Sequence, residues 1–341
     1  MKMKSLLLGS LLLAINFIMA QGAFSLRIGG GYAGPGLLKS DPVYGPIVDP
    51  YRPERDGLVE MANRNFFSDS SVQFIRGSYG QGMNFTLGLG YMINPYIGFD
   101  MGINYQQSSK MKTVETHDII LNNPPFVNIK LGQPITATIS TSAYTLSLMP
   151  SIVVAAALPN WKAYPYARLG LTLPVFGALF HDLDIMVPDS LFDKNPGFDE
   201  LLGKEPYYIG RKTDVRLETH GTISLGFNGA VGVAYKPLPY MNVFAEVNAQ
   251  YLTVRAKDTK ITKYDIDGVD KLEERGKYRT EFVYSDKLNT ESNNADFNPN
   301  YDRTKPKDDL RKNAPFHYFG FNVGVTFLLS KTTLKKKEVT Q

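Results

Sequence analysis

Apolar and polar residues alternate along much of this chain with a period of two, which is typical of β-strands with one apolar and one polar face. The clearest run is Tyr96–Gln106, where each odd-numbered residue is apolar and the residues between are glycine or polar, apart from Tyr96. Similar runs recur, and the sequence predicts eight strands of about ten or more residues. They are Ala23–Ala33, Met83–Ile93, Tyr96–Gln106, Tyr144–Ala157, Ala163–Val175, Thr222–Tyr235, Met241–Thr253 and Phe316–Leu329.

The connections between these strands alternate strictly between short and long. Short turns lie near 94–95, 158–162 and 236–240, and long loops near 34–82, 107–143, 176–221 and 254–315. A soluble barrel or sandwich also alternates along its strands, but it hides its apolar face and would seldom place four long loops on one rim. We therefore expect residues 21–330 to form an all-β fold, an antiparallel up-and-down transmembrane β-barrel of about eight strands with long extracellular loops.

The first twenty residues have the order of a secretory signal peptide. Lys2 and Lys4 precede an apolar run from Leu6 to Ala20, and Ala20 is the small residue before the expected cleavage. The run is too short for a spanning helix, and a buried core helix is the less favoured alternative because no capping residue begins it. We predict export, with cleavage after Ala20.

Composition agrees with this destination and narrows the chemistry. The chain has no cysteine, which excludes disulfides, thiolate metal sites and thiol catalysis. Its net charge of +4 gives little reason to expect nucleic acid. Aromatic residues form two bands near the strand ends, as expected of rings at the two membrane interfaces. One band is Tyr91, Tyr96, Trp161, Tyr164, Tyr235 and Tyr240, and the other is Tyr32, Phe85, Tyr105, Tyr144 and Tyr251.

The last predicted strand contains the motif Asn322-x-Gly324-x-x-Phe327-x-Leu329. It resembles the C-terminal signal by which the barrel-assembly machinery selects its substrates. With the eight-strand pattern, the chain is similar to the porin-like β-barrels of the OmpA transmembrane-domain and OmpX type. The resemblance implies an outer-membrane location in a Gram-negative cell, with periplasmic termini. A basic tail, residues 331–341, follows where many relatives end, and no peptidoglycan-binding domain is implied.

Candidate catalytic and metal-binding groups are few. Two histidines precede aspartates, in His117-Asp118 and His181-Asp182, but adjacent residues of a strand point to opposite sides, so we interpret them as solvated loop residues. The segment Asp265-Ile-Asp267-Gly268 resembles part of a calcium loop whose remaining ligands are missing. It reads better as a hairpin turn. We predict no enzyme activity, metal site or cofactor.

Four charged residues fall on the polar faces of the predicted strands near mid-membrane: Arg27, Asp100, Arg168 and Glu246. They lie on alternate strands, at similar heights, with alternating sign. Because a barrel of eight strands is just wide enough for side chains to fill it, and buried charges are costly unless paired, we expect Arg–carboxylate pairs that plug the lumen. One ring and two separate pairs are equally compatible with the pattern.

The functional prediction is a non-enzymatic outer-membrane barrel whose surface loops bind an extracellular ligand or support envelope integrity. The alternatives are a narrow channel for small solutes and an accessory barrel of a secretion machine. Expected partners are outer-membrane lipid, lipopolysaccharide and, during biogenesis, the barrel-assembly machinery. Mixed charge in the fourth loop, Arg255 to Lys312, fits a solvated surface as well as contact with lipopolysaccharide phosphates.

Overall fold

The computed structural model describes residues 23–35, 67–69, 78–121, 129–130, 135–156, 161–186 and 212–329. The predicted signal peptide, the basic tail and the turn at 157–160 lie outside these residues. The described chain is almost entirely antiparallel strand. None of its described helices is long and apolar enough to cross a membrane.

Eight strands close into a barrel, because the first strand pairs with both the second and the last. β1 pairs with β3 on one side and β17 on the other, for example Gly30 with Phe85 and with Val323. The predicted closed antiparallel barrel of eight strands is confirmed. In order around the wall the strands are β1 (Ala23–Pro35), β3 (Gly82–Met92), β4 (Ile97–Ser108), β7 (Ile135–Ala155), β8 (Ala163–Met186), β10 (Gly226–Leu238), β11 (Met241–Tyr251) and β17 (Tyr318–Leu328).

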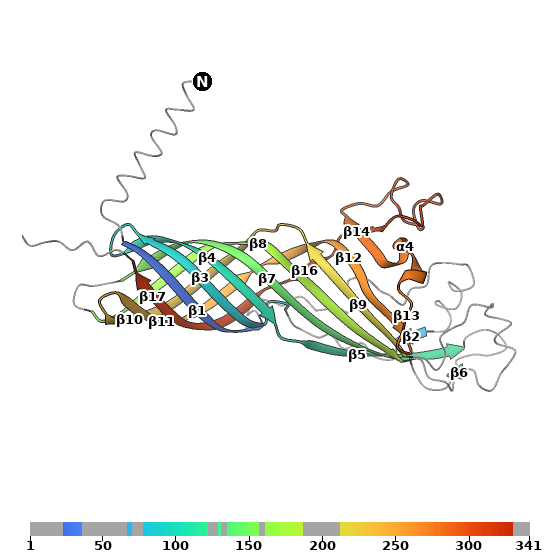
Figure 1. Cartoon of the computed structure of the whole chain (residues 1–341), viewed down its shortest axis with the longest axis horizontal. Helices are drawn as coiled ribbons and strands as arrows, with labels where there is room; N and C mark the ends of the chain where they lie inside the picture. The colour runs from blue at the N-terminus through green and yellow to red at the C-terminus, as the bar shows by residue number, and fades with distance from the viewer. Residues whose placement is uncertain are drawn as a thin grey trace, which may run out of the picture.

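Two of the predicted short turns are described, and each has a local cause. The turn between β3 and β4 is held by Asn94, whose side-chain oxygen accepts the backbone N–H groups of Tyr96 and Ile97 at 2.8 Å. The turn between β10 and β11 contains Pro239, and it is closed by the pairing of Leu238 with Met241. Both turns lie at the same rim (Figure 1).

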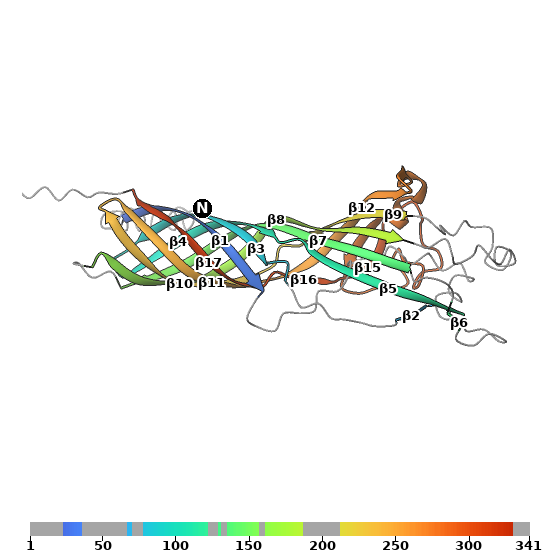
Figure 2. The same ribbon diagram turned by 90° about the horizontal axis from the view of Figure 1, so that it is seen from below.

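Beyond the opposite rim, β7 and β8 continue into a further set of paired strands that prolongs the barrel along its long axis, here called the extension sheet (Figures 1 and 2). Segments that the sequence assigned to loops are therefore partly strands. Besides the far halves of β7 and β8, the sheet contains β2 (Phe67–Asp69), β5 (Met111–Leu121), β6 (Ile129–Lys130), β9 (Lys212–Gly221), β12 (Thr253–Ile266), β13 (Val269–Asp270), β14 (Glu281–Ser285), β15 (Lys307–Leu310) and β16 (Asn313–Pro315). Two short helical turns, Glu273–Arg275 and α4 (Lys277–Thr280), join β13 to β14.

The inward-facing side chains are polar in the barrel and apolar in the extension sheet. In the barrel, large apolar side chains such as Leu89, Leu169 and Phe321 are exposed on the outer wall, and polar ones are buried inside. In the extension sheet the inner face is apolar: Ile139 and Leu217 are fully buried in its core.

β8 passes between these two regimes through a β-bulge. Its pairing with β7 steps from Ser147–Pro174 to Leu146–Phe176, which leaves Val175 without a partner in β7. As a result Val175 and Phe176 are both exposed, and the buried positions change from even numbers below the bulge to odd numbers from 179 to 185 above it. A single extra residue thus resets which side chains of β8 face inward.

Candidate functional site

The four charged side chains predicted for the lumen lie in contact, and we call them the charge ring. They come from β1, β4, β8 and β11, which alternate around the barrel wall. Arg27 lies 2.5 Å from Asp100, and Arg168 lies 3.3 Å from Asp100 and 2.5 Å from Glu246. A longer approach of 3.8 Å between Arg27 and Glu246 completes the circuit. The arrangement is one ring, not two separate pairs.

The ring is sealed from solvent and carries no formal net charge, since two guanidinium groups face two carboxylates. The Glu246 side chain is not exposed at all, and the other three are less than a tenth exposed. Tyr166 donates its hydroxyl to Glu246 Oε2 at 2.7 Å, and Asn322 donates to Oε1 at 3.4 Å. Such bonds help to offset the loss of hydration of a buried carboxylate.

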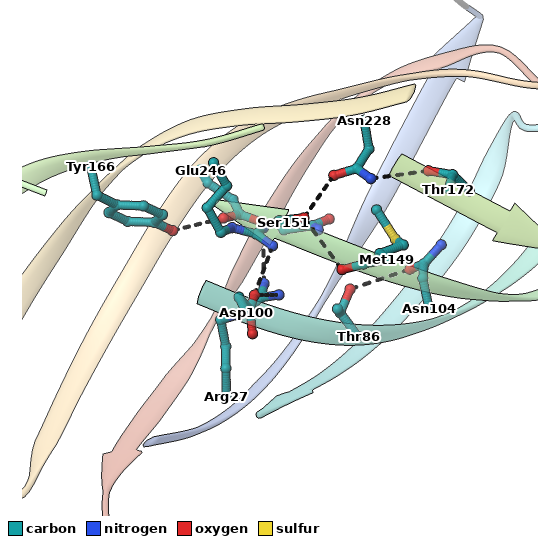
Figure 3. A network of polar contacts seen from close by, with 12 residues as sticks. Arg27, Thr86, Asp100, Asn104, Met149, Ser151, Tyr166, Thr172, Asn228 and Glu246 are labelled. Carbon is teal, nitrogen blue, oxygen red and sulfur yellow. Dashed lines mark hydrogen bonds and ion pairs between the residues drawn. The ribbon is translucent and has the colours of Figure 1, made fainter. Parts of the chain in front are cut away.

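Figure 3 shows Arg27, Asp100, Glu246 and Tyr166 converging from different strands. Tyr166 was not among the predicted lumen residues, although it occupies the same face of its strand as Arg168, two residues away. Asn322 was assigned only to the assembly motif, yet its side chain reaches the ring. In both cases the signal was a polar group at an inward position near the predicted charges.

Glycine makes room for the ring in a barrel this narrow. A Cβ atom added at Gly88 would lie 2.7 Å from Asp100 Oδ1 and 3.2 Å from Arg27 Nε, closer than such atoms normally approach. The residue beside the ion pair is therefore small because the charged side chains fill the space.

A layer of amides and hydroxyls lies above the ring. Thr86 donates to Asn104 at 3.2 Å, and Asn228 donates to Thr172 at 3.1 Å (Figure 3). Several amide atoms in this layer have no protein partner, including both side-chain polar atoms of Asn84. Buried polar atoms of this kind are normally hydrogen-bonded to ordered water. The upper lumen is thus polar but uncharged.

Two chain segments, 78–81 and 313–317, cross the mouth of the barrel where it meets the extension sheet. They are bonded to each other, since Tyr79 N–H donates to Pro315 O at 3.0 Å. They are also bonded to the wall, through Gln106 to Gly80 O and through Gln250 to Phe316 O. The Tyr79 and Phe316 rings are buried there, 5.7 Å apart. The lumen is therefore closed at its mouth as well as at the ring.

The histidines differ from expectation in one respect. His181 is not a solvated loop residue: it is fully buried on the inner face of the extension sheet, with Nδ1 2.9 Å from the Thr141 hydroxyl. Burial lowers the pKa of His181 to about 4. Its neighbour Asp182 points outward and pairs with Arg216 at 3.5 Å, so the two side chains do lie on opposite faces.

The described side chains of two other histidines lie in separate places. His220 is half-exposed and pairs with Asp258 at 2.9 Å, and His317 stacks on Tyr251 at the barrel mouth. The His117 side chain lies outside the described part of the structure. Across the described residues, no three His, Asp or Glu side chains are placed to hold a metal ion.

The segment with the calcium-like spacing forms the hairpin turn that the sequence favoured. β12 and β13 pair through Ile266–Val269 and Asp265–Asp270, with Asp267 and Gly268 in the turn between them. Both turn residues have positive φ, 51° and 81°. That conformation suits Asp-Gly in a two-residue turn.

The predicted assembly motif occupies the closing strand, β17, and the residue that follows it. Gly324 faces inward against β1, where a Cβ atom would lie 2.2 Å from Ile28 O. Phe327 pairs with Leu26 and Met241 on the two neighbouring strands, and Leu329 is exposed at its end. Its role as an assembly signal stays a prediction.

A closed barrel that is apolar outside and polar inside defines the class of integral β-barrel membrane proteins, since closure leaves no open edge in lipid. The family described as "Outer membrane protein beta-barrel domain" matches residues 10–272. The chain belongs to this family and is an outer-membrane protein.

The chain is also similar, weakly, to solved outer-membrane proteins. OprG from Pseudomonas aeruginosa is 13% identical with a TM-score of 0.33, covering 91% of this chain and 97% of that one. A major outer membrane protein from Thermus thermophilus is 9% identical with a TM-score of 0.33, covering 90% and 98%. CarO2 from Acinetobacter baumannii is 10% identical with a TM-score of 0.30, covering 90% and 98%. No curated protein sequence matches the chain.

Proposed function

We propose that this protein is a non-enzymatic, non-conducting outer-membrane barrel that holds the extension sheet on the cell surface as a binding platform. The charge ring carries the first half of this proposal. Four side chains from four strands meet at one level, and they leave no charge unpaired that would attract a permeating ion. The buried Tyr79 and Phe316 rings add a second barrier at the mouth.

The build of the extension sheet supports the second half. Its strands share a continuous apolar core, so it is a folded layer rather than a set of independent loops. It is continuous with the barrel through β7 and β8, which fixes its position relative to the membrane. Surface segments on a rigid barrel are where binding functions commonly reside.

Charged pairs on the outer face of this layer support contact with lipopolysaccharide. Lys212 lies 3.2 Å from Asp184 and 2.9 Å from Asp214, and Arg216 pairs with Asp182. These groups lie beyond the apolar outer surface of β8, on the part of the extension sheet that projects away from the membrane. Exposed pairs of this kind add little stability, so their side chains are free to exchange partners with phosphate.

Conductance in planar bilayers tests the plug. We expect the wild type to form no steady channel, and Arg168→Ala combined with Phe316→Ala to give discrete conductance steps, since together they open both barriers and leave the ring net negative. Arg216→Ala combined with Phe316→Ala, which leaves the ring intact, is the matched control and should behave like the wild type. A wild type that conducts steadily, with the Arg168→Ala double variant unchanged, would refute the plug.

Protease added to intact cells tests the orientation. The segment between Lys271 and Lys277 joins β13 to α4 and is largely exposed, so trypsin should cut there if the extension sheet lies outside the cell. Lys236, near the β10–β11 turn, should be cut only after the cells are opened. Cleavage at Lys236 in intact cells would reverse the proposed orientation.

One observation favours the second candidate, a narrow channel for small polar solutes. The amide layer above the ring keeps several polar atoms without protein partners, as a solute path would require. On this alternative the ring rearranges to admit solute. It predicts solute-dependent blocking of conductance in the wild type, which the same bilayer recordings would detect.

A further inference from the structure

β8 changes its partner on one side partway along its length, and the change leaves a break in the wall. Its pairing with β10 ends at Thr172–Gly226, and its pairing with β9 begins at Ala178–His220. Within the described residues, the stretch 173–177 has no strand partner on this side. The segment 222–225, which joins β9 to β10, passes the stretch without joining a strand.

A cavity of about 80 Å³ lies at this break. Its lining includes outward-facing residues, Phe176 and Ile223, whose exposed fractions are 65% and 81%. It also includes Leu179 and Phe316, which are only 3% and 4% exposed and belong to the core of the extension sheet. The cavity therefore leads from the outer wall of the barrel into an apolar interior.

The lining is suited to an uncharged, apolar occupant. No lysine, arginine, aspartate or glutamate contributes to it, and its polar side chains are three threonine hydroxyls and the imidazole of His220. Its volume is about half that of an apolar cavity of about 150 Å³ that binds benzene. It has room for a short alkyl segment rather than a whole ligand.

The height of the break places it beside lipid. Val175 lies twelve residues after Ala163, which begins β8 near the short-turn rim. At about 3.3 Å per residue and a tilt of about 40°, this is roughly 30 Å along the barrel axis. The apolar band of an outer-membrane barrel is about 25 Å tall, so the mouth opens at the outer edge of this band, where acyl chains meet headgroups. The exposed apolar side chains around the mouth continue the lipid-facing wall.

We propose that the break between β8 and the β9–β10 segment is a lipid-binding site, which takes an acyl-chain segment of a surrounding bilayer lipid and so completes the wall. The occupant is a lipid because the mouth opens sideways onto the apolar belt. The site is separate from the charge ring, and it stands whether or not the lumen conducts.

Photocrosslinking in nanodiscs tests the site. The full-length protein is reconstituted with phospholipid that includes a trace carrying a diazirine midway along one acyl chain, and the adducts are located by mass spectrometry after irradiation. We expect adducts on the buried residues Leu179 or Phe316. Thr222→Trp, which narrows the mouth, should reduce them severalfold. Ser224→Trp, a half-buried position in the same segment outside the lining, is the matched control and should leave them unchanged.

Three outcomes would overturn the proposal. Adducts confined to outward-facing residues outside the lining, such as Phe85 and Leu169, would show ordinary lipid contact only. Equal labelling of the interior residues in both tryptophan variants would show that the label reaches them by another route. Interior labelling by a free diazirine fatty acid, but not by the phospholipid, would make the occupant a dissolved apolar molecule. The wild-type adduct pattern is informative even if a variant fails to fold.

Discussion

The barrel and the extension sheet share two strands, yet they bury opposite kinds of side chain. Along β7 the odd-numbered residues face inward throughout. In the barrel these are Ser147 and Ser151, and in the extension sheet they are Ala137 and Ile139. One strand thus satisfies two surroundings: lipid outside a polar lumen, and water outside an apolar core. The kind of side chain that faces inward on β7 therefore follows the surroundings of each region, and it changes although the strand is continuous.

The two regions are therefore stabilised differently. In the barrel, a closed hydrogen-bonded wall keeps backbone groups out of lipid, and the interior requires paired charges and amides. In the extension sheet, burial of apolar side chains supplies the stability, as in a water-soluble domain. The variants below separate the two regions, beginning with the largest expected effect.

Glu246→Leu removes one carboxylate from the ring and leaves two buried arginines facing Asp100 alone. Loss of one partner of a buried ion pair costs about 3–5 kcal/mol, and we expect a loss of that order in urea unfolding in lipid vesicles. Adding Arg168→Met should restore most of the stability, because Arg27 and Asp100 remain paired. No rescue by the second substitution would contradict a ring held together by charge pairing.

Leu217→Ala tests the other region, because Leu217 is fully buried in the core of the extension sheet. Leucine-to-alanine changes in cores cost about 2–5 kcal/mol, and here the loss should be local. Trypsin should then cut the extension sheet faster, while the gel shift between boiled and unboiled protein persists. Val247→Ala, on the outward face of β11, is the control. Loss of the gel shift in Leu217→Ala would show that the two regions unfold as one.

Acid should weaken the extension sheet before the barrel, through His181. The pKa of His181 in the folded protein is about 4, below its ordinary value of 6.5, because its apolar setting excludes the charged form. The contribution of neutral, buried His181 to the free energy of unfolding is therefore complete above pH 6.5 and is lost as the pH falls toward 4. At pH 5 the loss is about 2 kcal/mol. Protease sensitivity measured against pH should show it, and His181→Leu should flatten that profile. An unchanged profile in His181→Leu would assign the acid response to other groups.

The sequence was sufficient to predict the barrel, because strong contrast between neighbours marks each spanning strand. In Tyr96–Gln106, large apolar residues alternate with glycine, aspartate and amides, and the strand was found within two residues of its ends. The four charged residues were predictable for the same reason. Few charged residues occupy inward positions of the spanning strands, and each stands out among the glycines and uncharged polar residues of those positions.

The strands of the extension sheet were not predicted, because the contrast between neighbouring apolar and polar residues along them is weak or reversed. Between Thr136 and Ser142 the outward side chains are threonine and serine, and the inward ones include small Ala137, so the period of two is faint. In 212–221 the period is present, but charged outward residues resemble those of a solvated loop. The burial of His181 depends on the bulge at Val175, because without the phase change His181 would face outward. Sequence alternation alone does not reveal a phase change within a strand.

The bulge at Val175 also makes the molecule modular. β7 passes between the two regions with its odd-numbered residues inward throughout, whereas β8 changes which of its residues face inward at one inserted residue within a continuous backbone. An engineer could therefore graft a different water-facing sheet above Val175, in the phase of Leu179 and Leu183, without redesigning the membrane-spanning wall below. Evolution has the same freedom, since an insertion or deletion of one residue at this joint exchanges the two faces of everything beyond it on this strand.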